Sequence, residues 1–284
     1  MENPSPALSG TGSTALVVAA LRAVESARND ALFTDRLAAP LVRAAQLANP
    51  LPTSLTQVGE EERTLLGLAA DGVALRTRYL DDYLTSSQAC QVVIVAAGLD
   101  TRAFRLDGLS GCTVFELDQA PVLDFKQKAL GRAGARPCCE RRAVAADLRE
   151  EWAPELVKAG FDPSLPSAWL MEGLLPYLPA AAEHQLFSTV HALSAPGSSI
   201  GVWATAEDTQ SASPANERVG AMYAAYGIDI TDIADNEPRQ RITELLPSLG
   251  WNVTEGTLDE LSERYRRPLS SSRRITFFTA RNTF

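Results

Sequence analysis

The chain has 284 residues, of which 45% are hydrophobic and 21% are charged. A chain of this length can bury a sizeable core in one α/β domain, and it has no apolar run near the roughly 20 residues that cross a bilayer. The formal net charge of -9 argues against nucleic acid as a partner, because binding to a phosphate backbone requires clustered Lys and Arg. We therefore expect a globular protein that binds neither membranes nor nucleic acid.

The first third of the chain is predicted to be helical after a short tail. Residues 1–12 are rich in Pro, Ser and Gly and lack the basic and apolar regions of a signal peptide, which predicts a disordered tail and a cytoplasmic protein. Apolar residues at helical spacing then predict helices over residues 14–27, 36–48 and 60–84. We expect residues 13–88 to form a helical cap on a core made by residues 89–284, all within one integrated domain.

Residues 91–102 combine a short apolar run with a turn of small residues. The run is typical of a buried parallel strand, and the turn carries a single glycine, Gly98, followed by Asp100. A pyrophosphate needs a glycine-rich loop and would be repelled by Asp100, whereas S-adenosyl-L-methionine has no phosphate and carries a positive sulfonium and ammonium. The turn thus favours a methyl donor over a dinucleotide, although Asp100 taken alone is explained equally well as a cap of the following helix.

The next three predicted strands each lead into an acid. Asp118 ends the second strand, about 20 residues after the turn, which is the spacing at which a carboxylate meets ribose hydroxyls. The third strand leads to Asp147 and the fourth to Glu172, with Tyr177 in the loop that follows. Because the ends of successive parallel strands face one crevice in a doubly wound sheet, we expect these side chains to share a binding site.

Alternating strands and helices predict an α/β fold with a doubly wound, seven-stranded sheet. The strands are expected at residues 91–97, 113–118, 142–146, 168–172, 198–204, 251–256 and 273–280. The segment 207–241 after the fifth strand is long for a connection, so it is either an insertion that forms a lid or a helical excursion packed at the sheet edge. The Arg residues near the carboxyl terminus, Arg267 among them, are predicted to line a solvated edge.

The four Cys and two His residues do not form a metal-binding motif. Cys138 and Cys139 are adjacent and the other two are widely spaced, which indicates buried or incidental thiols. His184 and His191 fall on one predicted helix that lies behind the sheet and points away from the crevice. We therefore expect no metal ion and no catalytic histidine.

The order of these motifs resembles the leucine carboxyl methyltransferase family, most closely its actinobacterial branch of S-adenosyl-L-methionine-dependent methyltransferases. The resemblance is carried by AAGLDTRAFRL from Ala96, VFELDQ from Val114, ADL from Ala146 and WLMEGLLPYL from Trp169. It runs from about residue 13 to the carboxyl terminus. The family usually has Gly-Ala-Gly where this chain has Ala-Ala-Gly, so a methyl group lies beside the expected cofactor and is expected to weaken its binding.

The resemblance implies a Rossmann-like methyltransferase fold and S-adenosyl-L-methionine as the cofactor. The residues that it implies for cofactor binding are Gly98, Asp100, Asp118, Gln119, Asp147, Leu148 and Glu172. Among them, Asp118 would hold the ribose hydroxyls, Asp147 with the backbone of the next residue would meet the adenine, and Glu172 would approach the α-amino group.

At the reacting end, the resemblance implies that Arg76 contacts a carboxylate, to which a guanidinium can donate two hydrogen bonds in a bidentate arrangement. Arg78 is the alternative by alignment. The simpler explanation of either residue is a pairing with Asp81 or Asp82 on a solvated helix face. Tyr177 is the second catalytic candidate.

These inferences favour an O-methyltransferase that acts on a carboxylate of a small molecule. A carboxylate is already ionised at neutral pH and needs no general base, whereas a phenol, the second choice, must be deprotonated. Some proteins of the family tailor polyketides and other natural products, which suggests secondary metabolism. A noncatalytic S-adenosyl-L-methionine-binding protein and an NAD-linked oxidoreductase stay open as alternatives, and the sequence indicates no oligomeric state.

Overall fold

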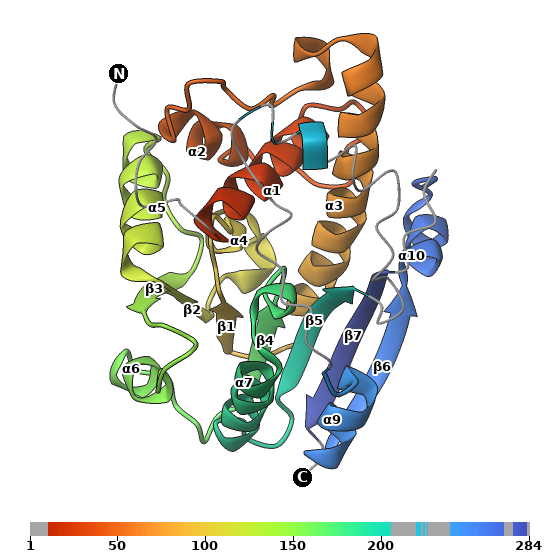
Figure 1. The fold of residues 1–284 in the computed structure, drawn as a ribbon. Coiled ribbons are helices and arrows are strands. Elements are labelled where there is room, and N and C mark those ends of the chain that lie inside the picture. Colours follow the sequence, from red (N-terminus) through yellow and green to blue (C-terminus); the bar gives the residue numbers. More distant parts are fainter. Residues whose placement is uncertain are drawn as a thin grey trace.

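The computed structural model describes residues 11–205, 220–222, 224, 226, 239–269 and 275–282, whose arrangement is drawn in Figure 1. Seven strands form one sheet in the order β3-β2-β1-β4-β5-β7-β6, and β7 is antiparallel to both of its neighbours. The strands are β1 (Gln91–Val95), β2 (Thr113–Asp118), β3 (Glu140–Ala145), β4 (Ser167–Met171), β5 (Ser199–Thr205), β6 (Trp251–Thr257) and β7 (Ile275–Asn282). The predicted seven-stranded, doubly wound α/β sheet is confirmed.

Helices connect the strands and build a layer in front of them. The α-helices are α1 (Thr11–Ser26), α2 (Ala38–Ala44), α3 (Glu60–Ser86), α4 (Arg102–Arg105), α5 (Ala120–Arg132), α6 (Ala153–Lys158), α7 (Ala180–Ala192), α9 (Ile242–Ser248) and α10 (Leu258–Tyr265). Short 3-10 turns are η2 (Leu55–Gln57), η3 (Asp107–Leu109) and η4 (Leu175–Tyr177). None of the helices in the described part of the chain has both the length and the apolar character of a bilayer span.

The central strand β1 is buried on both faces, as its continuous apolar sequence predicts. Val93 and Val95 belong to a cluster with residues of α6, α7 and α9 on one face of the sheet. Val92 and Ile94 point to the other face, where the carboxyl-terminal part of α3 and α4 cover them. Full burial of such a side chain stabilises the fold by about 1.5–3 kcal/mol, so this strand fixes the position of the turn that follows it.

Helices α1 and α2 and the amino-terminal part of α3 pack together at one end of the sheet (Figure 1). Their shared apolar cluster includes Leu16, Leu41 and Leu66, none more than 2% exposed, and also Leu99 from the turn after β1. The cap therefore rests directly on that turn. Helix α1 begins at Thr11, inside the segment 1–12 expected to be a tail, and residues 1–10 lie outside the described residues.

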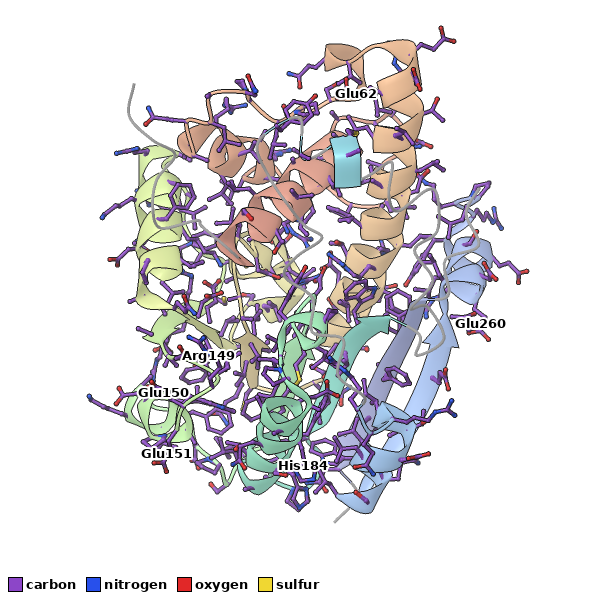
Figure 2. All side chains as sticks on the ribbon, in the orientation of Figure 1. Glu62, Arg149, Glu150, Glu151, His184 and Glu260 are labelled. Carbon is purple, nitrogen blue, oxygen red and sulfur yellow. The ribbon has the colours of Figure 1, made fainter. Side chains whose placement is uncertain are left out.

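The segment 207–241, expected to be a lid or a helical excursion, falls largely outside the described residues. Of its described residues, Met222 is 7% exposed and belongs to the apolar cluster of the cap. Tyr226 donates a hydrogen bond to Glu62, which Figure 2 labels near the amino-terminal end of α3. These contacts hold part of the segment against the cap.

Arg267 is buried, and the expectation of a solvated edge was wrong for it. Its side chain follows α10, and the residue is only 4% exposed. Nη2 donates to Glu25 Oε1 and Nη1 donates to Asp71 Oδ1, both at 3.1 Å. These acids belong to α1 and α3, so the ion pairs join the chain after α10 to the cap. A run of Arg residues in the sequence does not reveal buried acids that distant segments supply.

Candidate functional site

A cavity of about 300 Å³ lies between the cap and the ends of the central strands, a volume at the lower end of ligand sites. Its wall is built from α1, α3, β5 and the segments that follow β1, β2, β3 and β4. The wall includes all of the predicted site residues, which are Arg76, Gly98, Asp100, Asp118, Gln119, Asp147, Leu148, Glu172 and Tyr177. Strand ends that are far apart in the sequence thus meet in one crevice, as expected for a doubly wound sheet.

The turn after β1 uses its backbone amides within the protein. Gly98 N donates to Asp118 Oδ2 at 2.6 Å and Ala97 N donates to Leu117 O at 2.9 Å. Asp100 N donates to Ala97 O at 2.8 Å. A dinucleotide loop instead points free amides at a pyrophosphate. The geometry of this turn therefore agrees with the preference for a ligand without phosphate.

Two residues of this turn have left-handed backbone conformations. Gly98 has φ +45°, and a Cβ built on it would lie 3.2 Å from Cβ of Ala15 on α1, so the turn approaches the cap closely. Ala96, at the position where the family usually has glycine, has φ +53°. A left-handed conformation costs a residue with a Cβ about 1–2 kcal/mol, so Ala96 is strained.

We expect Ala96→Gly to raise the free energy of unfolding by about 1 kcal/mol, because the relief of strain exceeds the added flexibility of the unfolded chain. Thermal and denaturant unfolding measure this change. The matched control is Ala97→Gly, one residue on, where no positive φ is present and the same substitution should destabilise the protein. A lower free energy of unfolding in both variants would contradict the assignment of backbone strain to Ala96.

Asp118 stands at the end of β2 with both carboxylate oxygens facing backbone amides. Oδ2 accepts from Gly98 N, and Oδ1 accepts from Gln119 N at 2.7 Å. Burial raises the pKa of Asp118 above its usual value, although these two hydrogen bonds oppose the rise. Each oxygen keeps a further lone pair for a ligand, so the carboxylate can still accept from a pair of hydroxyls.

Asp147 lies two residues after β3 and is held by Arg149, which Figure 2 labels. Arg149 donates from Nε to Oδ1 at 2.9 Å and from Nη2 to Oδ2 at 2.5 Å. These hydrogen bonds lower the pKa of Asp147 to about 2. The carboxylate is therefore ionised across the physiological range, and Asp147 lines the cavity together with Leu148 and Gln119.

Glu172 follows β4 and is paired with two guanidinium groups. Arg76 Nε on α3 donates to Oε1 at 2.7 Å, and Arg102 Nη1 on α4 lies 2.8 Å from Oε2. Burial alone would raise the pKa of Glu172, but the charges of Arg102 and Arg76 outweigh it and lower the pKa below its usual value. Glu172 is thus an ionised acceptor that connects the cap to the sheet at the cavity wall.

The structure separates the two arginines that alignment left open. Arg76 is 7% exposed and lines the cavity. Arg78 lies on the outer face of α3, where its side chain is 44% exposed and pairs with Asp82 at 3.0 Å. Asp81 is not on a solvated face either, because it is 5% exposed and accepts from Arg102 Nε at 2.7 Å. The simple helix-face pairing therefore describes Arg78 and not Arg76.

Asp100 forms an ion pair with Arg102, and its Oδ1 accepts from the backbone N of that residue at 2.6 Å. Asp100 thus accepts from the first backbone N–H of α4, although Thr101 is the N-cap residue, and it also lines the cavity. Burial would raise the pKa of Asp100, but the charges of Arg102, Lys126 and Arg22 outweigh burial and lower the pKa to about 2.

Because Asp100 is more acidic in the folded state, its ionised form should stabilise the protein. A lowering from 3.8 to about 2 corresponds to about 2 kcal/mol at pH 7. The contribution is complete above about pH 4 and is lost as the pH falls toward the folded pKa near 2. Asp100→Asn should therefore be less stable than wild type by about 2 kcal/mol in urea unfolding at pH 7, and by less near pH 3.

The control is Asp124→Asn, at an exposed position on α5, which should match the stability of wild type at both pH values. A loss of stability in Asp100→Asn that does not change with pH would contradict the lowered pKa of Asp100.

Trp203 and Arg22 are among the residues of the cavity wall that sequence reasoning missed. Trp203 on β5 packs over Arg76, with the guanidinium carbon 4.6 Å from a ring centroid. Arg22 on α1 is 7% exposed, donates from Nε to Asp35 Oδ2 at 2.9 Å and from Nη2 to Leu99 O at 2.6 Å. An arginine on the apolar face of a predicted helix was the available signal for Arg22. The sequence offers no such signal for Trp203, because any strand of a buried sheet can carry a tryptophan.

The two histidines lie away from the cavity, and neither is in its wall. His184 is exposed on α7, as Figure 2 shows, and His191 packs edge-on against Trp251 at 6.4 Å. Within the described residues, no group of three or more His, Cys, Asp or Glu side chains has the geometry of a metal site.

Comparison with known proteins identifies the family. The model of the leucine carboxyl methyltransferase family matches residues 15–191. A protein of Saccharopolyspora erythraea, described as a "putative S-adenosyl-L-methionine-dependent methyltransferase", is 45% identical over 93% of this chain and 91% of its own length. Proteins with the same description from Mycobacterium marinum and Streptomyces coelicolor are 40% and 41% identical over 89% and 91% of this chain, and 86% and 87% of their own lengths.

Solved structures agree on the fold. A "putative methyltransferase" from Thermobifida fusca matches with a TM-score of 0.53 at 15% identity, over 87% of this chain and 94% of that one. A DUF574 family protein from Streptomyces avermitilis matches with a TM-score of 0.53 at 12% identity, over 86% and 96% of the two chains. The chain belongs to the leucine carboxyl methyltransferase family and is an S-adenosyl-L-methionine-dependent methyltransferase of a branch represented in Saccharopolyspora, Mycobacterium and Streptomyces.

Proposed function

We propose that this protein methylates an oxygen of a small-molecule acceptor, and that this oxygen belongs to a carboxylate. The observation that carries the proposal is the chemistry of the cavity wall. The described wall residues include acids held ionised by arginines but no histidine, lysine or cysteine. Such a wall can bind a charged methyl donor, yet it offers no side chain suited to deprotonate an acceptor at neutral pH.

The wall residues match the groups of S-adenosyl-L-methionine. Asp118 would accept from the ribose hydroxyls, and Asp147 would accept from the adenine amino group. At the other end, Glu172 would accept from the α-ammonium group and Arg76 would donate to the α-carboxylate, which gives the amino-acid part a partner for each charge. Gly98 would pass beneath this part of the cofactor.

When bound, the cofactor supplies an electrophilic methyl group on sulfur, and attack by an acceptor oxygen returns the carbon–sulfur bonding pair to sulfur, leaving a methyl ester and S-adenosylhomocysteine. The chain then has to orient the acceptor and exclude water from it. Leu174, Leu178 and Trp203 supply apolar wall beside Arg76, and Tyr177 supplies a hydroxyl group that we assign to acceptor positioning. Orientation and removal of water account for the rate.

The ionisation of the wall acids favours a carboxylate over a phenol. The pKa of Asp100 is about 2 and that of Glu172 is below its usual value, so both are weak bases. A phenol would need one of them to take its proton, whereas a carboxylic acid enters already ionised. We propose a carboxylic acid of secondary metabolism as the acceptor, with a phenol as the second choice.

The test is transfer of an isotopically labelled methyl group from S-adenosyl-L-methionine to a panel of aromatic and aliphatic carboxylic acids, with phenols and amines of matched size. The expected product carries label that mild base releases as methanol, since esters hydrolyse and ethers do not. The amide of each accepted acid is the control and should receive no label. Base-stable label on nitrogen, carbon or a phenol would contradict the carboxylate assignment.

A further inference from the structure

Trp203 is the one aromatic side chain that the structure stacks on an arginine of the cavity wall, among the residues it describes. The Arg76 guanidinium carbon lies 4.6 Å from a ring centroid of Trp203, within the range of a cation–π contact. The same guanidinium donates from Nε to Glu172 Oε1 at 2.7 Å. Three elements therefore fix Arg76, since it lies on α3, its carboxylate partner follows β4, and its ring partner lies on β5.

This double contact leaves the outer part of the guanidinium for a ligand. Within the described residues, neither η nitrogen of Arg76 has a hydrogen bond, and neither is a buried atom without a partner, so both keep contact with solvent on a residue that lines the cavity. Trp203 is itself partly buried and packs against an apolar cluster of α3, α10 and β7, made by Leu75, Leu258, Leu261 and Phe277. This packing holds the ring of Trp203 in place against the guanidinium of Arg76.

We infer that Trp203 is a positioning residue that aims the η nitrogens of Arg76 into the cavity and thereby makes the site select adenosyl ligands that carry an α-carboxylate. The inference rests on the proposed contact between Arg76 and that carboxylate. Without the ring, the long side chain of Arg76 keeps its Nε bond to Glu172 but gains other rotamers, so its donors are less often in place when the ligand arrives.

The test is calorimetric titration of the full chain with S-adenosyl-L-methionine and with its decarboxylated form, which differ only in the carboxylate. Wild type should prefer the carboxylated ligand. Trp203→Leu should lower the affinity for that ligand by about tenfold and leave the affinity for the decarboxylated ligand unchanged. Trp203→Phe, which retains an aromatic face, should recover most of the preference.

A double-mutant cycle separates positioning from a structural role. Arg76→Met should abolish the preference, and adding Trp203→Leu to Arg76→Met should cause no further change in it. The control is Tyr265→Leu, because Tyr265 stacks on Arg78 of the same helix, at 5.8 Å, outside the cavity wall, and should alter neither affinity.

Three results would overturn the inference. Equal losses for both ligands in Trp203→Leu would mean that the ring is structural or contacts the nucleoside. Unchanged affinities for both ligands in Trp203→Leu would mean that Arg76 is positioned without the ring of Trp203. A wild type that binds both ligands equally would remove the role of Arg76 but leave adenosyl binding intact, whereas a wild type that binds neither would overturn the proposed function itself.

Discussion

Replacing Asp118 by Asn should weaken the binding of S-adenosylhomocysteine by at least about 100-fold. A hydrogen bond to a charged group contributes about 1.5–3 kcal/mol, and the proposed contact has two ribose hydroxyls donating to one carboxylate. Titration calorimetry measures the change. Asp124→Asn, which removes an exposed charge on α5, should bind as wild type does.

The pH dependence distinguishes loss of this contact from general damage to the turn. The raised pKa of Asp118 means that wild-type affinity should start to fall, as the pH is lowered, above the pH at which an ordinary aspartate is protonated. The other two acids of the proposed contacts stay ionised there, since the pKa of Asp147 is about 2 and that of Glu172 is below its usual value. The decline should be absent in Asp118→Asn. An affinity that is flat down to about pH 4 in wild type would contradict the ribose assignment.

Replacing Arg102 by Met should lower the free energy of unfolding by about 3–5 kcal/mol, the usual cost of removing one partner from a buried ion pair. Arg102 is 2% exposed and pairs with Asp81, Asp100 and Glu172. Asp81 retains Arg105 and Glu172 retains Arg76, but Asp100 loses its ion-pair partner. Equilibrium unfolding in guanidinium chloride measures the loss.

Arg78→Met is the matched control for this prediction. Among the described residues, Arg78 has one ion-pair partner, Asp82, and its side chain is 44% exposed, so its removal should cost less than about 1 kcal/mol. If Arg102→Met fails to accumulate as folded protein, Arg102→Lys keeps the charge, loses the forked geometry and should give an intermediate loss. Equal stabilities for Arg102→Met and Arg78→Met would mean that the buried cluster contributes little.

The strand ends of the site could be predicted from the sequence because their signal is local. A continuous apolar run marks β1, and the acids Asp118, Asp147 and Glu172 occupy the residue or two at which each strand stops. Parallel strands then bring these positions together without any further information. The same argument gave the seven strands, whose observed limits differ from the expected ones by about two residues, since strand ends depend on hydrogen bonds to neighbours.

The arginine partners could not be predicted, because each pairing joins segments far apart in the chain. Arg76 and Glu172 are 96 residues apart, and nothing near Arg76 distinguishes it from Arg78 two residues later. We predicted a solvated helix face for Asp81, but α4 covers it and contributes Arg102 and Arg105 as its ion-pair partners. A buried charge network is specified by the packing of whole elements, and a single sequence does not list those contacts.

The place of β7 has a consequence for how the protein is made. β6 hydrogen-bonds only to β7 in the described sheet, and β7, the later of the two in the chain, joins it to β5. While a ribosome is still synthesising the chain, β6 emerges before β7, its partner in the described sheet. The part of the sheet made by β7 and β6 therefore has to be completed after β7 leaves the exit tunnel. Until then the edge of β5, the strand that carries Trp203, is open to pairing with other nascent chains.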